Sequence, residues 1–421
     1  MLSFGALARN TLWMILGQGV RILAQVGYFV LIARILHKDG YGAFSGAVAL
    51  VAVLAPFAGW GSGNLLVKNV ARDPASFSHY WGRALIVSCV SAGLLILLAL
   101  LLAWLILPAA VPPMMVLWVA ISDLFFTRIL ETCCLAFQAV HSLFKTAVLS
   151  VLFSAAKLLG VLLLLSSSGD DKLVTWSLLY LAGSAVVAVI GALWVTLELG
   201  APRWDLADWR HEFGEGFYFA TSFSAQRIYM DSDKALLTRL GSLEAAGIYT
   251  AAARIVEVAF IPVYSLLAAA YARFFTSGQQ GVKGTLDLSR RLLPYALAYA
   301  AAAGVGLYVL APVVPWLLGA DFAESVTAIR WLAPVPLLMS LHRFAADSLT
   351  GAGWQATRTH IEFSVAAVNV VLNLALVPYF SWRGTAWVTL FTELLLIVAL
   401  GLALRSIVRS AHGDHAAGAK P

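Results

Sequence analysis

Long apolar runs recur along the whole chain and constrain its fold more than any motif does. Each run has about 20 residues, enough for a helix to cross the hydrocarbon core of a bilayer. Only 12% of the residues are charged, against about 25% in soluble domains. The sequence therefore predicts an all-α polytopic membrane protein with twelve transmembrane helices. These are expected at 10–35, 43–66, 81–107, 113–139, 146–167, 173–197, 214–240, 246–272, 292–318, 326–349, 358–379 and 384–406.

A charged, tryptophan-containing segment interrupts this pattern half-way along the chain. We expect 198–213 to be a cytoplasmic interfacial linker, with Trp204 and Trp209 at the level of the lipid headgroups. It would join two six-helix bundles, 1–197 and 214–421, the second ending in a short cytoplasmic tail. Weak similarity between 39–50 and 244–255 predicts parallel, pseudo-symmetric repeats around a central cavity.

Basic residues are unevenly divided between the two sets of connecting loops. They are about three times as frequent on the side that holds both termini, and the positive-inside rule places that side in the cytoplasm. Basic loops beside a membrane are ordinary topology signals, so they do not call for nucleic acid as a partner. The first apolar run contains Arg21 and has no small-residue cleavage site, which argues against a cleaved signal peptide.

The first predicted helix carries polar residues at helical spacing. Gln18, Arg21, Gln25 and Tyr28 share one face, and lipid cannot satisfy their hydrogen bonds. An arginine stays charged at any accessible pH, and placing it at bilayer depth costs roughly 3 kcal/mol. We therefore predict that this face lines a cavity and that Arg21 binds phosphate, which a forked guanidinium suits well.

The seventh predicted helix repeats this arrangement. Ser224, Arg227, Asp231 and Lys234 share a face there, and Arg227 is a second candidate phosphate ligand. The alternative is that Asp231 neutralises Arg227 and that the pair only joins helices.

The remaining intramembrane charges fall into two groups. Arginines precede carboxylates by three or four residues in three predicted helices, which allows contact within one helix. These pairs are Arg128 with Glu131, Arg254 with Glu257, and Arg343 with Asp347. Charge compensation alone would explain each pair. Alternatively, the pairs with Arg128 and Arg343, both toward the cytoplasmic side, would form a basic ring at the inner mouth that attracts an anionic headgroup. Lys157 has no such partner and is predicted to line the cavity.

Carboxylates at membrane depth are candidates for coupling transport to an ion gradient. Four carboxylates have no evident partner in the sequence, and none of them stands out from the others: Asp123, Asp233, Glu362 and Glu393. The full set of coupling candidates is Asp231, Asp123, Glu131, Glu257, Asp347 and Glu393.

Three segments carry a family resemblance: ARILHKDGYGAFSGAVAL (33–50), DKALLTRLGSLEAAGIYTAAARI (233–255) and VAAVNVVLNLALVPYFSWRGTAWVTLFTE (365–393). With the twelve-helix layout, the chain resembles the polysaccharide-exporter branch of the multidrug/oligosaccharidyl-lipid/polysaccharide (MOP) exporter superfamily. It is most similar to flippases of the O-antigen type. The resemblance implies a bacterial inner-membrane protein that moves a polyprenyl-pyrophosphate-linked oligosaccharide to the outer leaflet by alternating access. Membrane lipids and a glycan polymerase would be its partners, and a monomer is expected.

Other functions remain open at this stage. A multidrug or organic-cation antiporter should have an acidic or aromatic cavity, and the buried cations argue against it. A glycan polymerase or ligase generally presents a large outer loop, but the outer loops here are short. Lipid II flippases generally carry two further helices. The sequence has no Walker-type phosphate loop and no His/Cys cluster, so we expect neither an enzyme nor a bound cofactor or metal.

Overall fold

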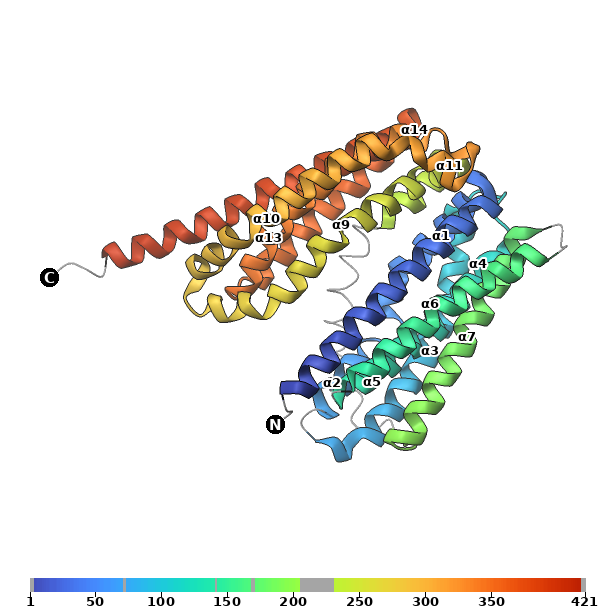
Figure 1. Ribbon diagram of the computed structural model, residues 1–421, viewed down its shortest axis with the longest axis horizontal. Coiled ribbons are helices and arrows are strands. Elements are labelled where there is room, and N and C mark those ends of the chain that lie inside the picture. Colours follow the sequence, from blue (N-terminus) through green and yellow to red (C-terminus); the bar gives the residue numbers. More distant parts are fainter. Residues whose placement is uncertain (1–3, 71–72, 141, 168–170, 205–230, 418–421) are drawn as a thin grey trace. The chain divides into compact units, whose positions relative to one another are not determined.

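Every regular element is helical in the part of the chain that the computed structural model describes (Figure 1). That part comprises 4–70, 73–140, 142–167, 171–204 and 231–417, with only the backbone described at 4–22, 143, 272 and 410–417. The chain divides into two compact units, Met1–Arg239 and Leu240–Pro421.

The first unit contains a bent helix followed by shorter ones. Its helices are α1 (Phe4–Leu54), α2 (Ser62–Val70), α3 (Phe77–Ile106), α4 (Pro113–Ala120), α5 (Thr127–Ala139), α6 (Leu143–Ser166) and α7 (Lys172–Leu199). A π-helical segment, Ile121–Phe126, joins α4 to α5. Short 3-10 turns lie at Ala55–Phe57 and Pro74–Ser76. Residues 231–240 are also helical and belong to this unit up to Arg239.

The second unit ends in the longest helix of the chain. It contains α9 (Leu243–Gly278), α10 (Gly281–Leu310), α11 (Val314–Leu318), α12 (Ser325–Leu332), α13 (Val335–Gly351) and α14 (Gln355–Ala417). Short 3-10 turns at Ala311–Val313 and Ala320–Phe322 flank α11. The helices α9, α10, α13 and α14 pack against one another (Figure 1).

Two backbone breaks turn long helices into pairs of spans. His37 (φ 55°, ψ 178°) interrupts α1, and Ser381 (φ 53°, ψ −139°) interrupts α14. With these breaks, the described helices correspond to the predicted spans other than the seventh, of which only 231–240 is described. The predicted fourth span, 113–139, coincides with Pro113–Ala139. The prediction of an all-α, twelve-helix membrane protein is confirmed.

Eight stretches among the described residues are long and apolar enough to cross a membrane. They are Leu23–Phe57, Pro74–Ile106, Pro113–Ala139, Phe144–Ser166, Lys172–Leu199, Leu243–Tyr271, Gly281–Leu318 and Gln355–Arg409. Large side chains such as Leu97, Leu197 and Val371 are exposed on them, as expected for faces that meet lipid.

Each unit has its own apolar core, and small residues bring its helices close together. In the first unit Trp81, Phe137 and Leu149 are fully buried in one cluster, and in the second Phe274 packs on Phe344. A Cβ atom at Gly278 would lie 1.9 Å from the carbonyl oxygen of Gly351, so α9 and α13 touch backbone to backbone. Close approach through small residues is typical of helices in membranes.

The boundary between the units lies further along the chain than the predicted linker. Contacts divide the chain after Arg239, so the end of the seventh helix clusters with the first unit. A Cβ atom at Gly46 of α1 would come within 2.2 Å of the Thr238 hydroxyl, which shows how tightly these helices pack. Residues 205–230 lie outside the described part of the chain. The linker at 198–213 and the two bundles therefore stay a prediction.

Candidate functional site: buried polar clusters in the two units

A lysine, a tyrosine and an aspartate from three helical segments meet inside the first unit. The Lys157 ammonium of α6 donates to the Tyr180 hydroxyl of α7 over 3.0 Å. That hydroxyl donates in turn to both carboxylate oxygens of Asp123, at 3.0 and 3.2 Å. A phenol hydroxyl thus lies between a half-buried ammonium and a half-buried carboxylate.

Aromatic rings and hydroxyls complete the surroundings of this cluster. The Lys157 ammonium lies 4.3 Å from the centre of the Phe153 ring and 4.2 Å from that of Tyr180, within cation–π range. Ser122 donates to Asp123 over 3.2 Å, and its oxygen lies 2.8 Å from that of Ser184. Within this cluster the Lys157 ammonium therefore contacts two aromatic rings and a phenol hydroxyl.

The π-helical segment positions the carboxylate of this cluster. Asp123 lies within Ile121–Phe126, where the chain widens from α-helical to π-helical hydrogen bonding. Such single-turn bulges are found frequently at functional sites. The sequence missed this cluster because its members are 23 and 57 residues apart. Lys157 and Asp123 are not without partners, and that interpretation was wrong.

The polar face predicted on the first helix is only partly described. Gln18 and Arg21 lie on α1, where the structure describes the backbone alone. Gln25 is exposed, and the Tyr28 ring packs 5.5 Å from that of Trp176. Arg227 lies outside the described residues. The assignment of Arg21 and Arg227 as phosphate ligands therefore stays a prediction.

Two of the remaining predicted cations are held within the first unit. Lys234 is 3.0 Å from Asp231, and the two side chains are 7% and 15% exposed. Arg128 pairs with Glu131 at 2.6 Å, as the spacing predicted, and also donates to the carbonyl of Ala55 over 2.7 Å. This second contact ties α5 to the turn that ends α1.

In the second unit, a more exposed pair also follows the sequence prediction. Arg254 lies 3.0 Å from Glu257 on α9, and the two side chains are 53% and 33% exposed. Their exposure distinguishes them from the buried pairs.

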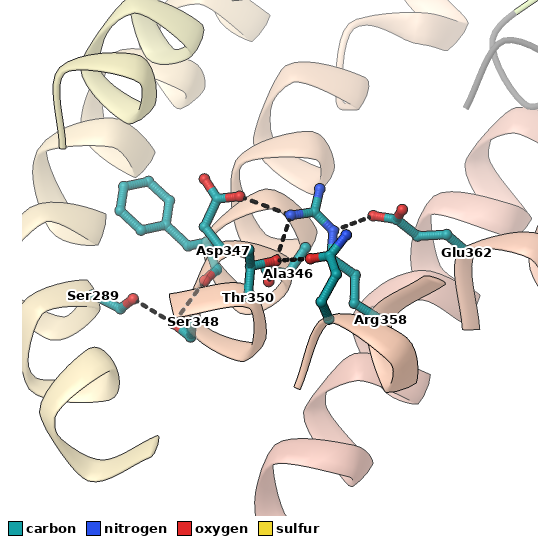
Figure 2. A network of polar contacts seen from close by, with 9 residues as sticks. Ser289, Ala346, Asp347, Ser348, Thr350, Arg358 and Glu362 are labelled. Atoms are coloured by element: carbon teal, nitrogen blue, oxygen red, sulfur yellow. Dashed lines mark hydrogen bonds and ion pairs between the residues drawn. The ribbon is translucent and has the colours of Figure 1, made fainter. Parts of the chain in front are cut away.

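The predicted pair of Arg343 with Asp347 is wrong. Asp347 pairs with Arg358 of the next helix, at 3.1 Å, and Arg358 also binds Glu362 at 2.8 Å (Figure 2). Arg343 was predicted as the partner because it lies four residues before Asp347 on the same helix. The turn between α13 and α14 instead brings the Arg358 guanidinium next to the Asp347 carboxylate. The Nε atom of Arg343 is buried without a hydrogen-bond partner among the described residues.

Further hydrogen bonds connect this arginine to the turn. Arg358 donates to the Thr350 hydroxyl over 2.9 Å (Figure 2). Thr350 in turn donates to Gln355 over 2.8 Å. One guanidinium therefore joins the end of α13 to the start of α14.

A buried histidine lies beside Glu393, another predicted coupling residue. The Nδ1 atom of His342 in α13 is 2.6 Å from a carboxylate oxygen of Glu393 in α14, and both side chains are at most 5% exposed. This contact has no signal in the sequence, because the two residues are 51 positions apart. Among the described residues, no group of three or more His, Cys, Asp or Glu side chains is placed to hold a metal.

A family model described as a polysaccharide biosynthesis protein matches residues 7–277, well over half of the chain. The chain belongs to this family. Among curated proteins, no match to the chain is found.

Solved transporter structures share its fold. An inward-facing MATE-family multidrug resistance transporter of the MOP superfamily has a TM-score of 0.74 and 15% identity, covering 92% of this chain and 96% of its own. The lipid II flippase MurJ in an inward closed conformation has a TM-score of 0.67 and 13% identity, covering 91% and 87%.

A third similar structure is a MOP superfamily transporter from Pyrococcus furiosus with a binding pocket of reverse polarity. Its TM-score is 0.65 at 15% identity, and 95% of each chain is covered. The likeness to these structures shows the fold of MOP transporters, and the predicted resemblance to this superfamily is confirmed. The chain is a multi-pass membrane protein of a polysaccharide biosynthesis family, and its structural neighbours are transporters.

Proposed function

We propose that the protein is a flippase that moves a polyprenyl-pyrophosphate-linked oligosaccharide from the cytoplasmic to the outer leaflet. The match of the polysaccharide biosynthesis family over residues 7–277 carries this proposal, since it joins glycan assembly to the fold of a transporter. The lipid II flippase supports the same class of substrate, because lipid II is also a lipid-linked cargo and the fold is shared.

The charge of the intramembrane residues fits a pyrophosphate headgroup. Arg21 has no carboxylate on its own helix, and with Arg227 it would bind the two phosphates as the sugars pass through a polar cavity. Gln18, Gln25 and Arg254 are further candidates for contact with the cargo. Arg128 and Lys234 are paired within their own unit, so they are weaker candidates, and Arg343 and Lys157 complete the set.

We propose an inner-membrane, monomeric protein with both termini in the cytoplasm. The lipid tail would stay in the bilayer while alternating access moves the headgroup. Glycan polymerase and other assembly proteins would take up the product at the outer face.

The structure narrows the candidates for ion coupling. Asp231, Glu131, Glu257 and Asp347 are each paired with a cation. Asp123 accepts from a phenol and a serine, and Glu393 meets a histidine ring. Carboxylates held by neutral or titratable groups can exchange a proton or an ion without breaking a fixed ion pair. We therefore place coupling at Asp123, with Glu393 as the second candidate.

Binding of purified protein to lipid-linked and cationic ligands tests this function. Polyprenyl pyrophosphate should bind more tightly than a cationic dye, because fixed arginines attract a di-anion and repel a cation. Tighter binding of the dye would favour the multidrug antiporter instead. Lipid II as a competitor distinguishes the peptidoglycan precursor from other lipid-linked glycans.

Transport in cells tests the proposed phosphate ligands. Arg21→Ala and Arg227→Ala should each abolish glycan export while membrane insertion is retained. Arg239→Ala is the matched control, since it removes an exposed arginine at the end of the same predicted span, 214–240. Export that survives both of the first two changes would refute the role of these arginines.

A further inference from the structure

A pocket opens where three connections of the second unit meet. The connections are the residues just before α9, the turn between α11 and α12, and the break in α14 at Ser381. Its volume is about 420 Å³, within the range of pockets that bind small molecules. The positive-inside prediction places these connections at the outer face of the membrane.

The rim of this outer pocket combines charged and aromatic side chains. Two carboxylates, Glu244 and Glu324, and the guanidinium of Arg383 line it. The rings of Tyr379 and Phe380 lie beside them and are 83% and 46% exposed. Ala245 and Ile248 add apolar surface.

One carboxylate is oriented by a buried indole. Trp382, only 5% exposed, donates its indole N–H to Glu324 over 3.2 Å. The Arg383 guanidinium lies 5.6 Å from the centre of the same ring. The carboxylate and the guanidinium are therefore anchored to one rigid side chain.

The backbone at the pocket is strained. Ser381 has φ 53° and ψ −139°, a region that residues with a side chain rarely adopt, and its side chain lines the pocket. A glycine would adopt this conformation without strain. Strain of this kind is concentrated at binding and catalytic sites, where it fixes the direction of neighbouring side chains.

We propose that this pocket binds a sugar residue of the translocated oligosaccharide as it reaches the outer face. The proposal rests on the proposed flippase function. Sugar hydroxyls donate to carboxylates and accept from a guanidinium, and the apolar face of a sugar ring packs on an aromatic ring. The outer pocket offers all three kinds of group together.

Two simpler explanations account for fewer of these features. A belt of interfacial aromatic residues explains Tyr379 and Phe380 but not the converging charges. A site for a lipid phosphate would not hold two carboxylates against one guanidinium, because the excess negative charge repels an anion. A neutral, hydroxyl-rich ligand fits the mixture of charges.

Titration of the purified full-length protein with a lipid-free oligosaccharide tests the proposal. The probe is the repeat-unit oligosaccharide released by mild acid from the host's own polyprenyl-linked precursor, and saturation-transfer NMR measures its Kd. The wild type should bind it, and the double variant Glu244→Gln/Glu324→Gln should bind at least about tenfold more weakly. Gln keeps an acceptor for the Trp382 indole and removes only the charge.

Further variants keep the test independent of folding. Tyr379→Ala changes a side chain that is almost fully exposed, and it should weaken binding severalfold without altering the thermal melt. Asp321→Asn, on the same turn but outside the pocket lining, is the matched control and should bind like the wild type. Equal binding by the wild type and both pocket variants overturns the proposal, as does displacement of the oligosaccharide by inorganic pyrophosphate.

A flipping assay in proteoliposomes separates this proposal from the flippase function. If the lipid-linked oligosaccharide is flipped but the lipid-free oligosaccharide does not bind, the pocket proposal fails and the flippase stands. If the lipid-free oligosaccharide binds in the outer pocket but no lipid-linked cargo is flipped, the flippase proposal fails.

Discussion

Lys157 in the first unit and Arg358 in the second are both partly buried cations, but the contacts described for them differ. The Lys157 ammonium contacts the Tyr180 hydroxyl and the rings of Tyr180 and Phe153, and the same hydroxyl donates to Asp123. Arg358 contacts two carboxylates directly, together with a hydroxyl (Figure 2). In the first cluster a hydroxyl lies between the cation and the carboxylate, whereas in the second the cation and the carboxylates are paired directly.

The two clusters also differ in the backbone structure that carries them. Arg358 joins the end of α13 to the start of α14 across a short turn, which is a place where two helices must be held together. Asp123 lies in a π-helical segment, where the helix departs from regular geometry. We infer that the Arg358 network is structural and that the cluster of Lys157, Tyr180 and Asp123 changes during transport.

Removal of Arg358 should have the largest effect on stability. Arg358→Ala leaves Asp347 and Glu362 without their cation in a largely buried site, and breaking a buried pair in this way costs roughly 3–5 kcal/mol. We expect a markedly lower apparent Tm in detergent and less folded protein in the membrane. Differential scanning fluorimetry of the purified variant measures this loss.

The control variant at Arg358 keeps the positive charge but replaces the planar guanidinium, with its several N–H donors, by a single ammonium group. Arg358→Lys should recover part of the lost Tm, because an ammonium cannot contact both carboxylates and Thr350 in the same way. A Tm for Arg358→Ala equal to that of the wild type would show that the network is not structural, and the contrast with Lys157 would disappear.

Loss of the Asp123 charge should affect transport more than stability. Asp123→Asn still accepts hydrogen bonds from Tyr180 and Ser122 but can no longer titrate. We expect ion-driven flipping in proteoliposomes to be largely lost, because carboxylates at membrane depth mark proton relays and ion pathways. The apparent Tm should change less than in Arg358→Ala.

Tyr180→Phe completes the test of this cluster. It removes the hydroxyl that joins Lys157 to Asp123 and keeps the ring that Lys157 contacts. Gradient-driven flipping should fall with it, whereas exchange of substrate without a gradient should continue. Unchanged gradient dependence in both variants would move the coupling site to Glu393 and its histidine partner.

The sequence predicted the helices well and the contacts between helices poorly. Hydrophobic runs located the twelve spans, since burial in lipid demands about 20 apolar residues wherever a helix crosses. Contacts within one helix were also accessible, and the pairs of Arg128 with Glu131 and Arg254 with Glu257 are present.

Contacts between helices depend on rotation and packing, which spacing along the chain does not reveal. The pairing of Asp347 with Arg358 and that of His342 with Glu393 could not be predicted for this reason. The outer pocket is formed by three separate connections, so it too was missed. Hydrophobic periodicity identifies regular helices, but it does not reveal the π-helical segment at Asp123.

The pair of Arg254 and Glu257 provides the smallest expected effect on stability. Its side chains are 53% and 33% exposed, and an exposed pair at this spacing contributes less than about 1 kcal/mol. Arg254→Ala should therefore leave the apparent Tm nearly unchanged.

If Arg254 contacts the anionic headgroup, Arg254→Ala should nevertheless weaken the binding of polyprenyl pyrophosphate, whereas Glu257→Ala should not weaken it. Equal binding by the wild type and Arg254→Ala would make the arginine a simple surface partner of Glu257. If Arg254→Ala instead lowered the apparent Tm as much as Arg358→Ala does, direct pairing within the membrane would be structural even where the side chains are half exposed.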